Sequence, residues 1–344
     1  MTSDIIYTSE AGVKVSEILN QGGYNKIAVL VDENTRKDCY PLITNHLSEH
    51  IVIEIKSGEI NKTLDTCGFI WQELTHYAFD RKSVLINLGG GVIGDMGGFC
   101  ASTYKRGIDF INIPTTLLSQ VDASVGGKLG IDFNGYKNHI GLFRDPNAVI
   151  IDQTFLKTLP SNELRSGFAE VIKHHLIADH SGWVKLNEMT FPKLNWSEVV
   201  PHSVKIKSDI VNNDPYEGGL RKVLNFGHTI GHAIESYLLN EDRAILHGEA
   251  IAAGMICEGY LSVKKGFISN EECKALEAYI LSVFDKTEIK PNDLDGILSY
   301  LIQDKKNQKN KIMASLLKNI GEANWDIEIT SEEVSEAINY YNSL

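Results

Sequence analysis

The chain has 344 residues, with 33 Lys and Arg against 45 Asp and Glu, so its formal charge is −12. With 43% hydrophobic residues it has enough apolar material for two packed domains or one large one. The acidic balance disfavours nucleic acid and anionic membranes as partners, because such surfaces require an excess of Lys and Arg. An anionic ligand therefore requires a local cluster of basic residues.

The cysteines and the N-terminal sequence indicate a reducing, cytoplasmic environment. Five cysteines stand apart without a CxxC pair, and their odd number cannot close into a complete disulfide framework. The N-terminal MTSDIIYTSEAG lacks the basic start and the apolar stretch of a signal sequence. No run approaches the roughly 20 apolar residues of a membrane-spanning helix. We therefore expect no association with membranes.

The first 150 residues alternate short apolar runs with segments of helical length. Apolar runs this continuous are typical of parallel strands that are buried on both faces. Residues 1–155 are therefore expected to form an α/β domain with a Rossmann-like parallel sheet. The expected strands are Lys26–Val31, Ile51–Ile55, Ser83–Leu88, Asp109–Pro114 and Ala148–Ile151.

Residues 156–344 differ in pattern from the first part. β-Branched runs become few, apolar residues recur at helical spacing, and helix-start signals occur at Pro160–Glu163 and Ser331–Glu333. We therefore predict an all-helical C-terminal domain. Two segments have the composition of loops: Asp122–Gly141, rich in glycine and polar residues, and the Lys-rich Asp304–Lys311.

A glycine-rich sequence, GGGVIGD at Gly89–Asp95, follows the third expected strand. Glycines at this position let the backbone approach a pyrophosphate, which the N–H groups and the positive end of the next helix then bind. A tight strand-to-helix turn without a ligand is the alternative interpretation. The acid of the usual dinucleotide pattern comes about 20 residues later, but Asp109 here precedes a strand. Asp32, at the end of the first expected strand, is a better candidate for binding sugar hydroxyls.

Histidines and a glutamate in the second half have the composition of a metal site. His228 and His232 are separated by four residues and therefore share one face of a helix. His247 stands where a new helix is expected to begin, and Glu170 lies upstream. One Glu with two His suits a zinc-type divalent ion that keeps a position open for substrate. Spacing alone also allows His174, four residues after Glu170, as a ligand.

Basic residues recur near these motifs. Lys128 follows two glycines, Lys137 precedes Asn138, and the helical half contains Lys207, Arg221 and the pair Lys305-Lys306. Such residues are most often solvated surface. If they converge, they can bind a substrate that carries both a phosphate and a carboxylate.

Several long motifs follow one another along the chain: GGGVIGD at 89–95, TYKRG at 103–107, IPTTLLSQVDASVGGK at 113–128, YKN at 136–138, AEVIK at 169–173, LRKVLNFGHTIGHAIE at 220–235 and LHGEAIAAGM at 246–255. Together, and in this order, they closely resemble the 3-dehydroquinate synthases of the shikimate pathway. The resemblance covers most of the chain, and motifs of this length are specific. It departs from the family at His174-His175-Leu176, where an aromatic or small residue and a glycine are usual, and at Phe143–Pro146.

The resemblance implies an NAD-binding domain, a metal-binding domain and a homodimer. It implies Glu170, His228 and His247 as ligands of one divalent ion, zinc or cobalt, with His232 behind them or on the substrate side. The implied NAD contacts are Asp32, Asn34, Ser57, Gly58, Glu59, Lys62, Gly91, Val92, Ile93, Gly94, Asp95, Thr115, Thr116, Phe155, Leu156, Lys157 and Thr158, together with Lys128 and Lys137. The implied catalytic and substrate-binding residues are Arg106, which reaches across from the partner subunit, and Asp122, Lys128, Lys137, Asn138, Lys173, Lys207, Arg221, Asn225 and Lys305.

The implied reaction converts 3-deoxy-D-arabino-heptulosonate 7-phosphate into 3-dehydroquinate and phosphate. It proceeds by transient oxidation at C5, phosphate elimination, re-reduction, ring opening and intramolecular aldol closure. The nearest alternative is another sugar-phosphate cyclase, of the deoxyinosose or valiolone type; Asn138, Lys207, Arg221 and Asn225 favour the dehydroquinate substrate. A polyol or glycerol-phosphate dehydrogenase and a catalytically silent binding protein are more distant alternatives. The dehydrogenase would release NADH, and the silent protein would be expected to lack a metal ligand or the glycine turn.

Overall fold

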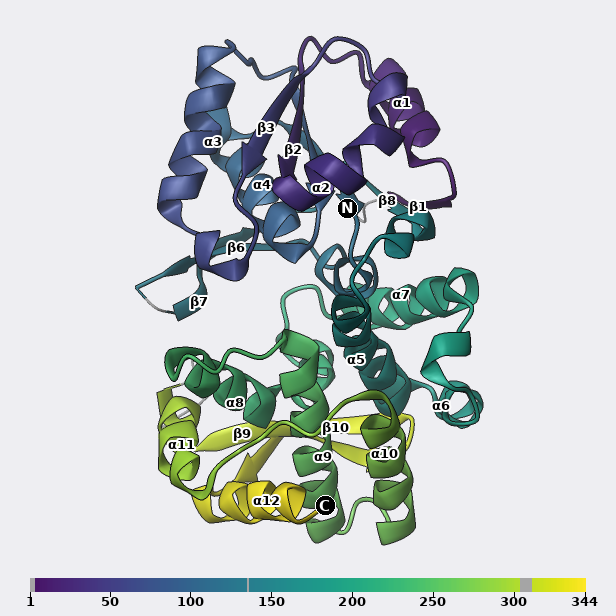
Figure 1. Cartoon of the computed structure of the whole chain (residues 1–344), viewed down its shortest axis with the longest axis vertical. Helices are drawn as coiled ribbons and strands as arrows, with labels where there is room; N and C mark the ends of the chain where they lie inside the picture. Colours follow the sequence, from purple (N-terminus) through teal and green to yellow (C-terminus); the bar gives the residue numbers. More distant parts are fainter. Residues whose placement is uncertain (1–3, 135, 304–310) are drawn as a thin grey trace. The chain divides into compact units, whose positions relative to one another are not determined.

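The computed structural model describes residues 4–134, 136–303 and 311–344 (Figure 1). It divides into two compact units, Met1–Pro160 and Ser161–Leu344, so the division falls shortly after the expected boundary at residue 155. Among the described residues, no helix combines the length and the hydropathy needed to cross a membrane. All five cysteines lie in the described part of the chain, and each is buried and without a disulfide.

The N-terminal unit is built on a parallel sheet, as the sequence predicted. Within the described residues the strand order is β1-β8-β5-β4-β2-β3, and each neighbouring pair runs parallel. The five expected strands are confirmed to within a residue at each end, and the sequence analysis missed only β1 at the sheet edge. The strands are β1 (Asp4–Thr8), β2 (Ile27–Asp32), β3 (Ile51–Ile55), β4 (Val84–Gly89), β5 (Asp109–Pro114) and β8 (Ala148–Asp152).

Helices cover both faces of this sheet (Figure 1). Apolar side chains from α3 and α4 pack with one set of strand residues, such as Leu30 and Leu85. Side chains from α1, such as Val15, pack with the alternate set, which includes Val29 and Ile86. The strands are therefore buried on both faces, which explains their continuous apolar runs. The helices of this unit are α1 (Ala11–Gly22), α2 (Glu33–Asp38), α3 (Leu64–His76) and α4 (Gly91–Thr103).

The segment expected as a loop at Asp122–Gly141 instead forms most of an antiparallel hairpin, β6 (Lys128–Phe133) and β7 (Tyr136–Phe143). Leu129 and Ile131 alternate along β6 and are buried in the core with α4. Gly126 and Gly127 stand before the hairpin, where Gly127 has a left-handed φ of 61°, whereas Gly130 and Gly141 lie within the strands and face each other across the pair. Two alternating apolar positions are thus enough to fix this strand on the domain.

The C-terminal unit is rich in helices, as predicted, but it is not all-helical. An antiparallel pair, β9 (Ile312–Asn319) and β10 (Glu322–Ile329), packs against α9. Its turn contains Gly321, whose φ of 90° favours glycine, and Ala314 and Leu316 alternate toward the core. The helices are α5 (Ser161–Ala178), α6 (His180–Asn187), α7 (Trp196–Asn213), α8 (His228–Asn240), α9 (His247–Lys264), α10 (Asn270–Val283), α11 (Leu294–Gln303) and α12 (Ser331–Ser343).

Candidate active site

The glycine turn and Asp32 lie at the carboxyl ends of two neighbouring strands. β4 ends in Gly89 and runs beside β2, which ends in Asp32. From β2 the chain goes to β3 on one side, and from β4 it goes to β5 on the other. The strand order therefore reverses between β2 and β4, and in open α/β sheets ligands bind at this crevice.

The geometry of the glycine turn fits a phosphate group. Gly90 precedes α4, and a Cβ built on it would approach Thr116 Cγ2 to 3.2 Å. A Cβ on Gly94, in the first turns of α4, would meet no heavy atom within 4 Å. The helix therefore presents its first N–H groups and an open backbone face, which is how helix N-termini bind pyrophosphate.

Asp32 and the neighbouring loop are held by short-range hydrogen bonds. Asp32 Oδ1 accepts from the N–H groups of Asn34 at 3.0 Å and Thr35 at 2.8 Å, so the carboxylate caps α2. Glu33 in turn accepts from the backbone N–H and the hydroxyl of Ser57, at 2.9 and 2.6 Å. Glu33 was not predicted as a site residue, but it fixes the Ser57-Gly58 loop beside Asp32.

A buried ion pair joins Asp95, the last residue of the glycine motif, to two other segments of the N-terminal unit. The Lys62 ammonium, 3% exposed, donates to Asp95 Oδ2 on α4 and to Asn138 Oδ1 on β7, each at 2.6 Å. Glu59 lies 3.8 Å from the same ammonium. Burial raises the pKa of the Asp95 carboxyl. Burial lowers the pKa of Lys62, but the carboxylates of Asp95 and Glu59 outweigh this and raise it overall, so the lysine carries its charge.

The remaining predicted residues of the N-terminal unit fall into two groups. The first group lies at the carboxyl edge of the sheet. Thr115 and Thr116 directly follow β5. The helical turn η6 (Gln153–Lys157), which follows β8, contains Phe155, Leu156 and Lys157, and Thr158 comes next. Lys128 and Lys137 are exposed on the β6–β7 hairpin, and Asp122 lies in the short helical turn η5 (Ser119–Ala123) before it.

Arg106 is separated from the glycine turn within the chain. It follows α4 at the end opposite Gly91, and 13 helical residues span about 20 Å. Its backbone φ of 70° is left-handed, like that of Lys105 at 49°. Arg106 lines a shallow surface pocket with Asp80, Arg81 and Lys105. This unit alone therefore does not bring Arg106 to the carboxyl edge of its sheet.

In the C-terminal unit, three side chains expected to bind metal converge. The Glu170 carboxylate on α5 is fully buried, and its Oε1 lies 3.4 Å from His228 Nε2 and 3.8 Å from His247 Nε2. Among the described residues, no donor gives either Glu170 oxygen a hydrogen bond of ordinary geometry. A buried carboxylate that faces two imidazole nitrogens in this way fits a divalent ion between them.

Both imidazoles present the correct nitrogen to this point. His228 Nδ1 lies 3.1 Å from the carbonyl oxygen of Phe226, and His247 Nδ1 lies 3.4 Å from Glu235 Oε2. A proton on each Nδ1 leaves the lone pair on Nε2, which faces Glu170. Burial lowers the pKa of His247, but the carboxylates of Glu170 and Glu235 raise it overall to about 9. A metal ion would take the place of the proton that these carboxylates otherwise favour.

His232 and His174 also lie near the trio. His228, His232 and His247 place ligand atoms within 4.8 Å of one another. His174 Nε2 is 4.0 Å from Glu170 Oε2, and its Nδ1 is 2.7 Å from the Ser203 hydroxyl. His174 therefore approaches the second oxygen of Glu170, while His228 and His247 approach the first.

Cationic and amide side chains lie on elements that pack near these ligands. α5, α7 and the helical turn η8 (Leu220–Asn225) contact one another. Lys173 on α5 contacts Glu170, and Lys207 and Arg221 are likewise buried. Arg221 Nη1 donates to the Pro215 carbonyl at 2.6 Å. The amide of the remaining predicted residue on η8, Asn225, donates to Glu217 at 2.9 Å. Lys305 lies outside the described residues.

Glu258 and a set of glycines position the ligand helices, and the sequence analysis did not single them out. The fully buried Glu258 on α9 accepts from the N–H groups of Gly227 at 2.6 Å and Ile230 at 3.0 Å, at the start of α8. A Cβ on Gly254 would lie 1.9 Å from the Gly227 carbonyl oxygen. Glycine therefore allows α8 and α9 to approach closely, which sets His228 beside His247. The sequence feature that could have indicated Glu258 is its position about three helical turns after His247, on the same face of one helix.

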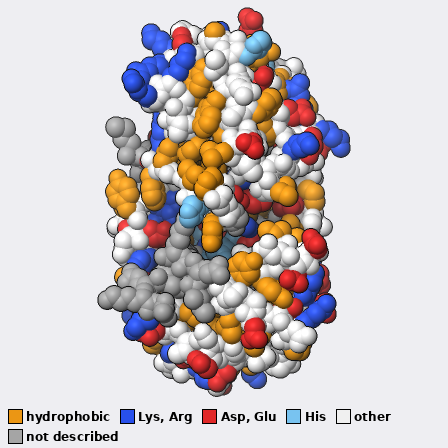
Figure 2. Space-filling model, turned by 90° about the vertical axis from the view of Figure 1, so that its left-hand side faces the viewer, with side chains coloured by type: hydrophobic (Ala, Val, Ile, Leu, Met, Phe, Trp, Pro, Cys, Tyr) orange, Lys and Arg blue, Asp and Glu red, His pale blue; other side chains and the backbone are white. Residues whose placement is uncertain are grey.

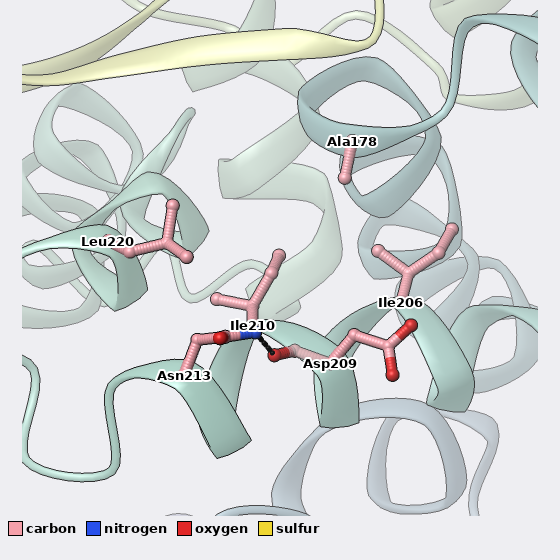
Figure 3. A pocket seen from close by; sticks show the side chains of 6 residues that line it. All are labelled: Ala178, Ile206, Asp209, Ile210, Asn213 and Leu220. Carbon is pink, nitrogen blue, oxygen red and sulfur yellow. Dashed lines mark hydrogen bonds between the residues drawn. The ribbon is translucent and has the colours of Figure 1, made fainter.

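A pocket of about 190 Å³ opens elsewhere on this unit, between the end of α5, α7 and η8 (Figure 3). Its wall is largely apolar, with Ala178, Ile206, Ile210 and Leu220, and its polar edge is Asp209 and Asn213. None of the candidate site residues lines it. The converging charged and imidazole groups, and not this pocket, therefore mark the candidate site of the C-terminal unit.

Known proteins match both units of the chain. Sequence models described as 3-dehydroquinate synthase N-terminal and C-terminal match residues 52–166 and 167–307. A 3-dehydroquinate synthase of Parabacteroides distasonis is 39% identical over 342 residues, which cover 98% of this chain and 97% of the relative. The chain belongs to the 3-dehydroquinate synthase family.

Solved structures of two enzymes with different names share the fold. A 2-deoxy-scyllo-inosose synthase complexed with carbaglucose-6-phosphate, NAD+ and Co2+ superposes with a TM-score of 0.84 at 23% identity, covering 98% of this chain and 96% of that one. A 2-epi-5-epi-valiolone synthase from Streptomyces hygroscopicus, with NAD+ and Zn2+ bound, gives 0.87 at 22% identity, covering 100% and 97%. At this identity the likeness concerns the fold. The 3-dehydroquinate synthase family is assigned by the sequence match.

Proposed function

We propose that this chain catalyses the reaction of its family, the conversion of 3-deoxy-D-arabino-heptulosonate 7-phosphate into 3-dehydroquinate and phosphate. It is a phosphorus–oxygen lyase of the shikimate pathway. The observation that carries the residue assignment is the convergence of His228 Nε2 and His247 Nε2 on one oxygen of the buried Glu170. The glycine turn, at the point where the strand order of the sheet reverses, supports the assignment of the dinucleotide-binding residues.

The enzyme uses NAD and one divalent metal ion. Glu170, His228 and His247 would hold the ion, and the turn at Gly91–Asp95 with Asp32 would hold the dinucleotide. When bound, NAD supplies reversible hydride transfer at the substrate's C5, and the ion supplies Lewis acidity toward an oxygen there.

The residues of the chain orient both imidazoles for metal binding. Glu235 faces His247 Nδ1 and the Phe226 carbonyl faces His228 Nδ1, so Nε2 is in each ring the nitrogen that would bind the ion, which in His247 would displace the Nε2 proton. Lys173 neutralises the second oxygen of Glu170. Glu170, Lys173 and Glu235 are buried, and the low local dielectric strengthens their electrostatic contacts.

The substrate is an anionic sugar acid, and the basic residues are assigned to bind it. Lys207 and Arg221 are buried on adjoining elements and offer an amine and a guanidinium for a carboxylate or phosphate. Asn225 supplies an amide on the same turn as Arg221. Lys128 and Lys137 supply exposed charge from the β6–β7 hairpin. Binding and orientation of the two anionic groups then limit the conformations that the open-chain sugar can adopt before ring closure.

The active form is proposed to be a homodimer in which Arg106 serves the partner's site. The length of α4 separates Arg106 from the glycine turn of its own chain. Exposed apolar side chains occur on α3 and on the β6–β7 hairpin, among them Phe69, Tyr136 and Phe143. Figure 2 views the side that carries these elements, and hydrophobic side chains gather there on the N-terminal unit. Apolar surface of this kind favours association with a second copy.

The test is a turnover assay with 3-deoxy-D-arabino-heptulosonate 7-phosphate, catalytic NAD and zinc, in which phosphate release and NADH absorbance are followed together. We expect many turnovers of phosphate release without accumulation of NADH, and none from a His247→Ala variant. NADH that accumulates in step with turnover would identify a dehydrogenase instead. Phosphate release from other sugar phosphates, and not from this one, would identify another cyclase.

A further inference from the structure

A second group of possible metal ligands lies on the C-terminal unit, where α5, α6 and α7 meet. His175 is in the last turn of α5, Asp179 caps α6, and His202 is on α7. Each of the three offers a ligand atom, and these atoms all lie within 4.8 Å of one another. His175 follows Glu170 by five residues, so it points away from the face of α5 that carries Glu170.

Hydrogen bonds from outside the group already orient two of the three side chains. His175 Nδ1 lies 2.8 Å from the Val171 carbonyl oxygen, so the proton sits on Nδ1 and the lone pair on Nε2. Asp179 Oδ1 accepts from the Gly182 N–H and the Ser181 hydroxyl, each at 2.9 Å. Its other oxygen, Oδ2, is 2.7 Å from His202 Nε2. Metal sites are typically held by partners of this kind.

The protonation states also suit metal binding. Burial lowers the pKa of His175, which is 5% exposed, so its imidazole is neutral at pH 7. Burial raises the pKa of Asp179, but hydrogen bonds from Gly182 and His202 lower it overall to about 2, so the carboxylate is ionised. The third side chain, His202, is 49% exposed, so an ion can reach the group from solvent on this side.

We propose that His175, Asp179 and His202 bind a second divalent ion of the zinc type, separate from the ion held by Glu170. Two imidazoles and a carboxylate are borderline donors that favour zinc over calcium or magnesium, which prefer oxygen ligands. Bonds of about 2.0–2.1 Å place tetrahedral donors about 3.4 Å apart, so the half-exposed His202 has to move outward from Asp179 Oδ2, which its Nε2 now approaches to 2.7 Å. Water completes the coordination.

The ion joins three helices and stabilises the unit without entering the reaction. His175, Asp179 and His202 come from α5, the start of α6 and α7, which otherwise pack through side chains. A ligand that binds only the folded chain raises its stability by mass action. Binding at this junction should therefore raise the melting temperature of the protein and leave the substrate specificity unchanged.

The experiment counts metal in the full chain. Protein stripped by a chelator is dialysed against zinc and washed, and bound metal is measured by mass spectrometry. We expect about two zinc ions per wild-type chain and about one in each of the His202→Gln and His247→Ala variants. The matched control is His180→Gln, an exposed histidine next to Asp179 but outside the group, which should keep both ions.

A second measurement separates this site from the catalytic one. In the His247→Ala background, zinc should still raise the melting temperature, and adding His202→Gln should abolish that rise. In the wild-type background, His202→Gln should keep its turnover with zinc present. One zinc ion per wild-type chain, or two in His202→Gln, would overturn the proposal. Loss of turnover in the His180→Gln control would implicate the junction in catalysis and would also contradict it.

Discussion

Glu235 Oε2 lies 3.4 Å from Nδ1 of His247, on the opposite side of the imidazole from Glu170. The two side chains come from α8 and from the first residue of α9. A carboxylate behind a metal-binding histidine fixes its ring and makes it a stronger ligand. Glu235 therefore acts on the metal through His247, although it is not expected to touch the ion.

Replacing Glu235 by Gln should weaken metal binding while the fold is retained. The amide keeps the shape of the side chain but loses the charge that favours a proton on Nδ1, and such changes typically cost about 10–100-fold in metal affinity. Zinc affinity is measured by competition with a chromophoric chelator. The control is Glu241→Gln at the exposed end of the same helix. Equal affinities in the two variants would show that Glu235 has no role at the metal.

A side chain at Gly94 should block the dinucleotide while it stabilises the helix. A Cβ there meets no protein atom within 4 Å, so the side chain of Gly94→Leu would leave the helix into the space assigned to pyrophosphate. Gly68 on α3 is equally open, and it supplies the matched control Gly68→Leu. Both changes should raise the free energy of unfolding by about 0.5–1 kcal/mol.

Only Gly94→Leu should raise the dissociation constant for NAD, by about tenfold or more. The constant is measured by calorimetric titration of NAD into each variant. If both leucine variants bind NAD as the wild type does, the dinucleotide does not lie over the first turns of α4.

The central sheet could be predicted from the sequence because burial on both faces leaves a strong signal. The strands that contain Val29 and Ile86 are continuous apolar runs between helices. β1 was missed because an edge strand is short and half-exposed, so its pattern is weak. The β6–β7 hairpin was missed because its strands bury only a few alternating residues and are preceded by glycines.

Local motifs of the site were visible in the sequence, but their convergence was not. The i, i+4 spacing placed His228 and His232 on one helix face. The same spacing, from Glu170 to His174, also made His174 a possible metal ligand. The outcome depends on how α5 packs against α9, which no local pattern records. Glu258 was overlooked for the same reason, because its partners are backbone N–H groups at the start of another helix.

Acid should remove the contribution of Asp293 to stability. Burial raises the pKa of this carboxyl, but the hydrogen bond from Arg243, at 2.8 Å, helps to lower it overall below its ordinary value of 3.8. The stabilising effect is therefore present above pH 3.8 and is lost as pH falls through the lower pKa of the folded state. Asp293→Asn should cost about 2 kcal/mol of unfolding free energy at pH 7.

Thermal unfolding from pH 7 down to about pH 3 checks this prediction. The gap in melting temperature between wild type and Asp293→Asn should narrow at the acid end, because the wild-type carboxyl then becomes protonated. Asp295→Asn, exposed on the neighbouring turn, is the control and should follow the wild type throughout. A gap that stays constant with pH would mean that Asp293 contributes through packing and not through its charge.

Two inactive chains should restore activity to each other if Arg106 serves the partner's site. Arg106→Ala should lower kcat/KM by about 100-fold, as expected for loss of a positioned charged donor, and His247→Ala should lose the metal. In a heterodimer of the two variants, the chain with the intact metal ligands receives an intact Arg106 from its partner. The other site carries both defects. Heterodimers purified through two different tags should therefore show about half of the wild-type activity.

A different activity is expected if Arg106 acts within its own chain. If Arg106 serves its own chain, each site of the heterodimer carries one defect, and the mixture stays as inactive as its parents. A monomer in solution would give the same inactivity but would fail to form the doubly tagged species, so the purification itself separates these two cases. The experiment thus tests separately whether the chain forms a dimer and which subunit's site Arg106 serves. The second question arises because the arginine lies about 20 Å along α4 from its own glycine turn.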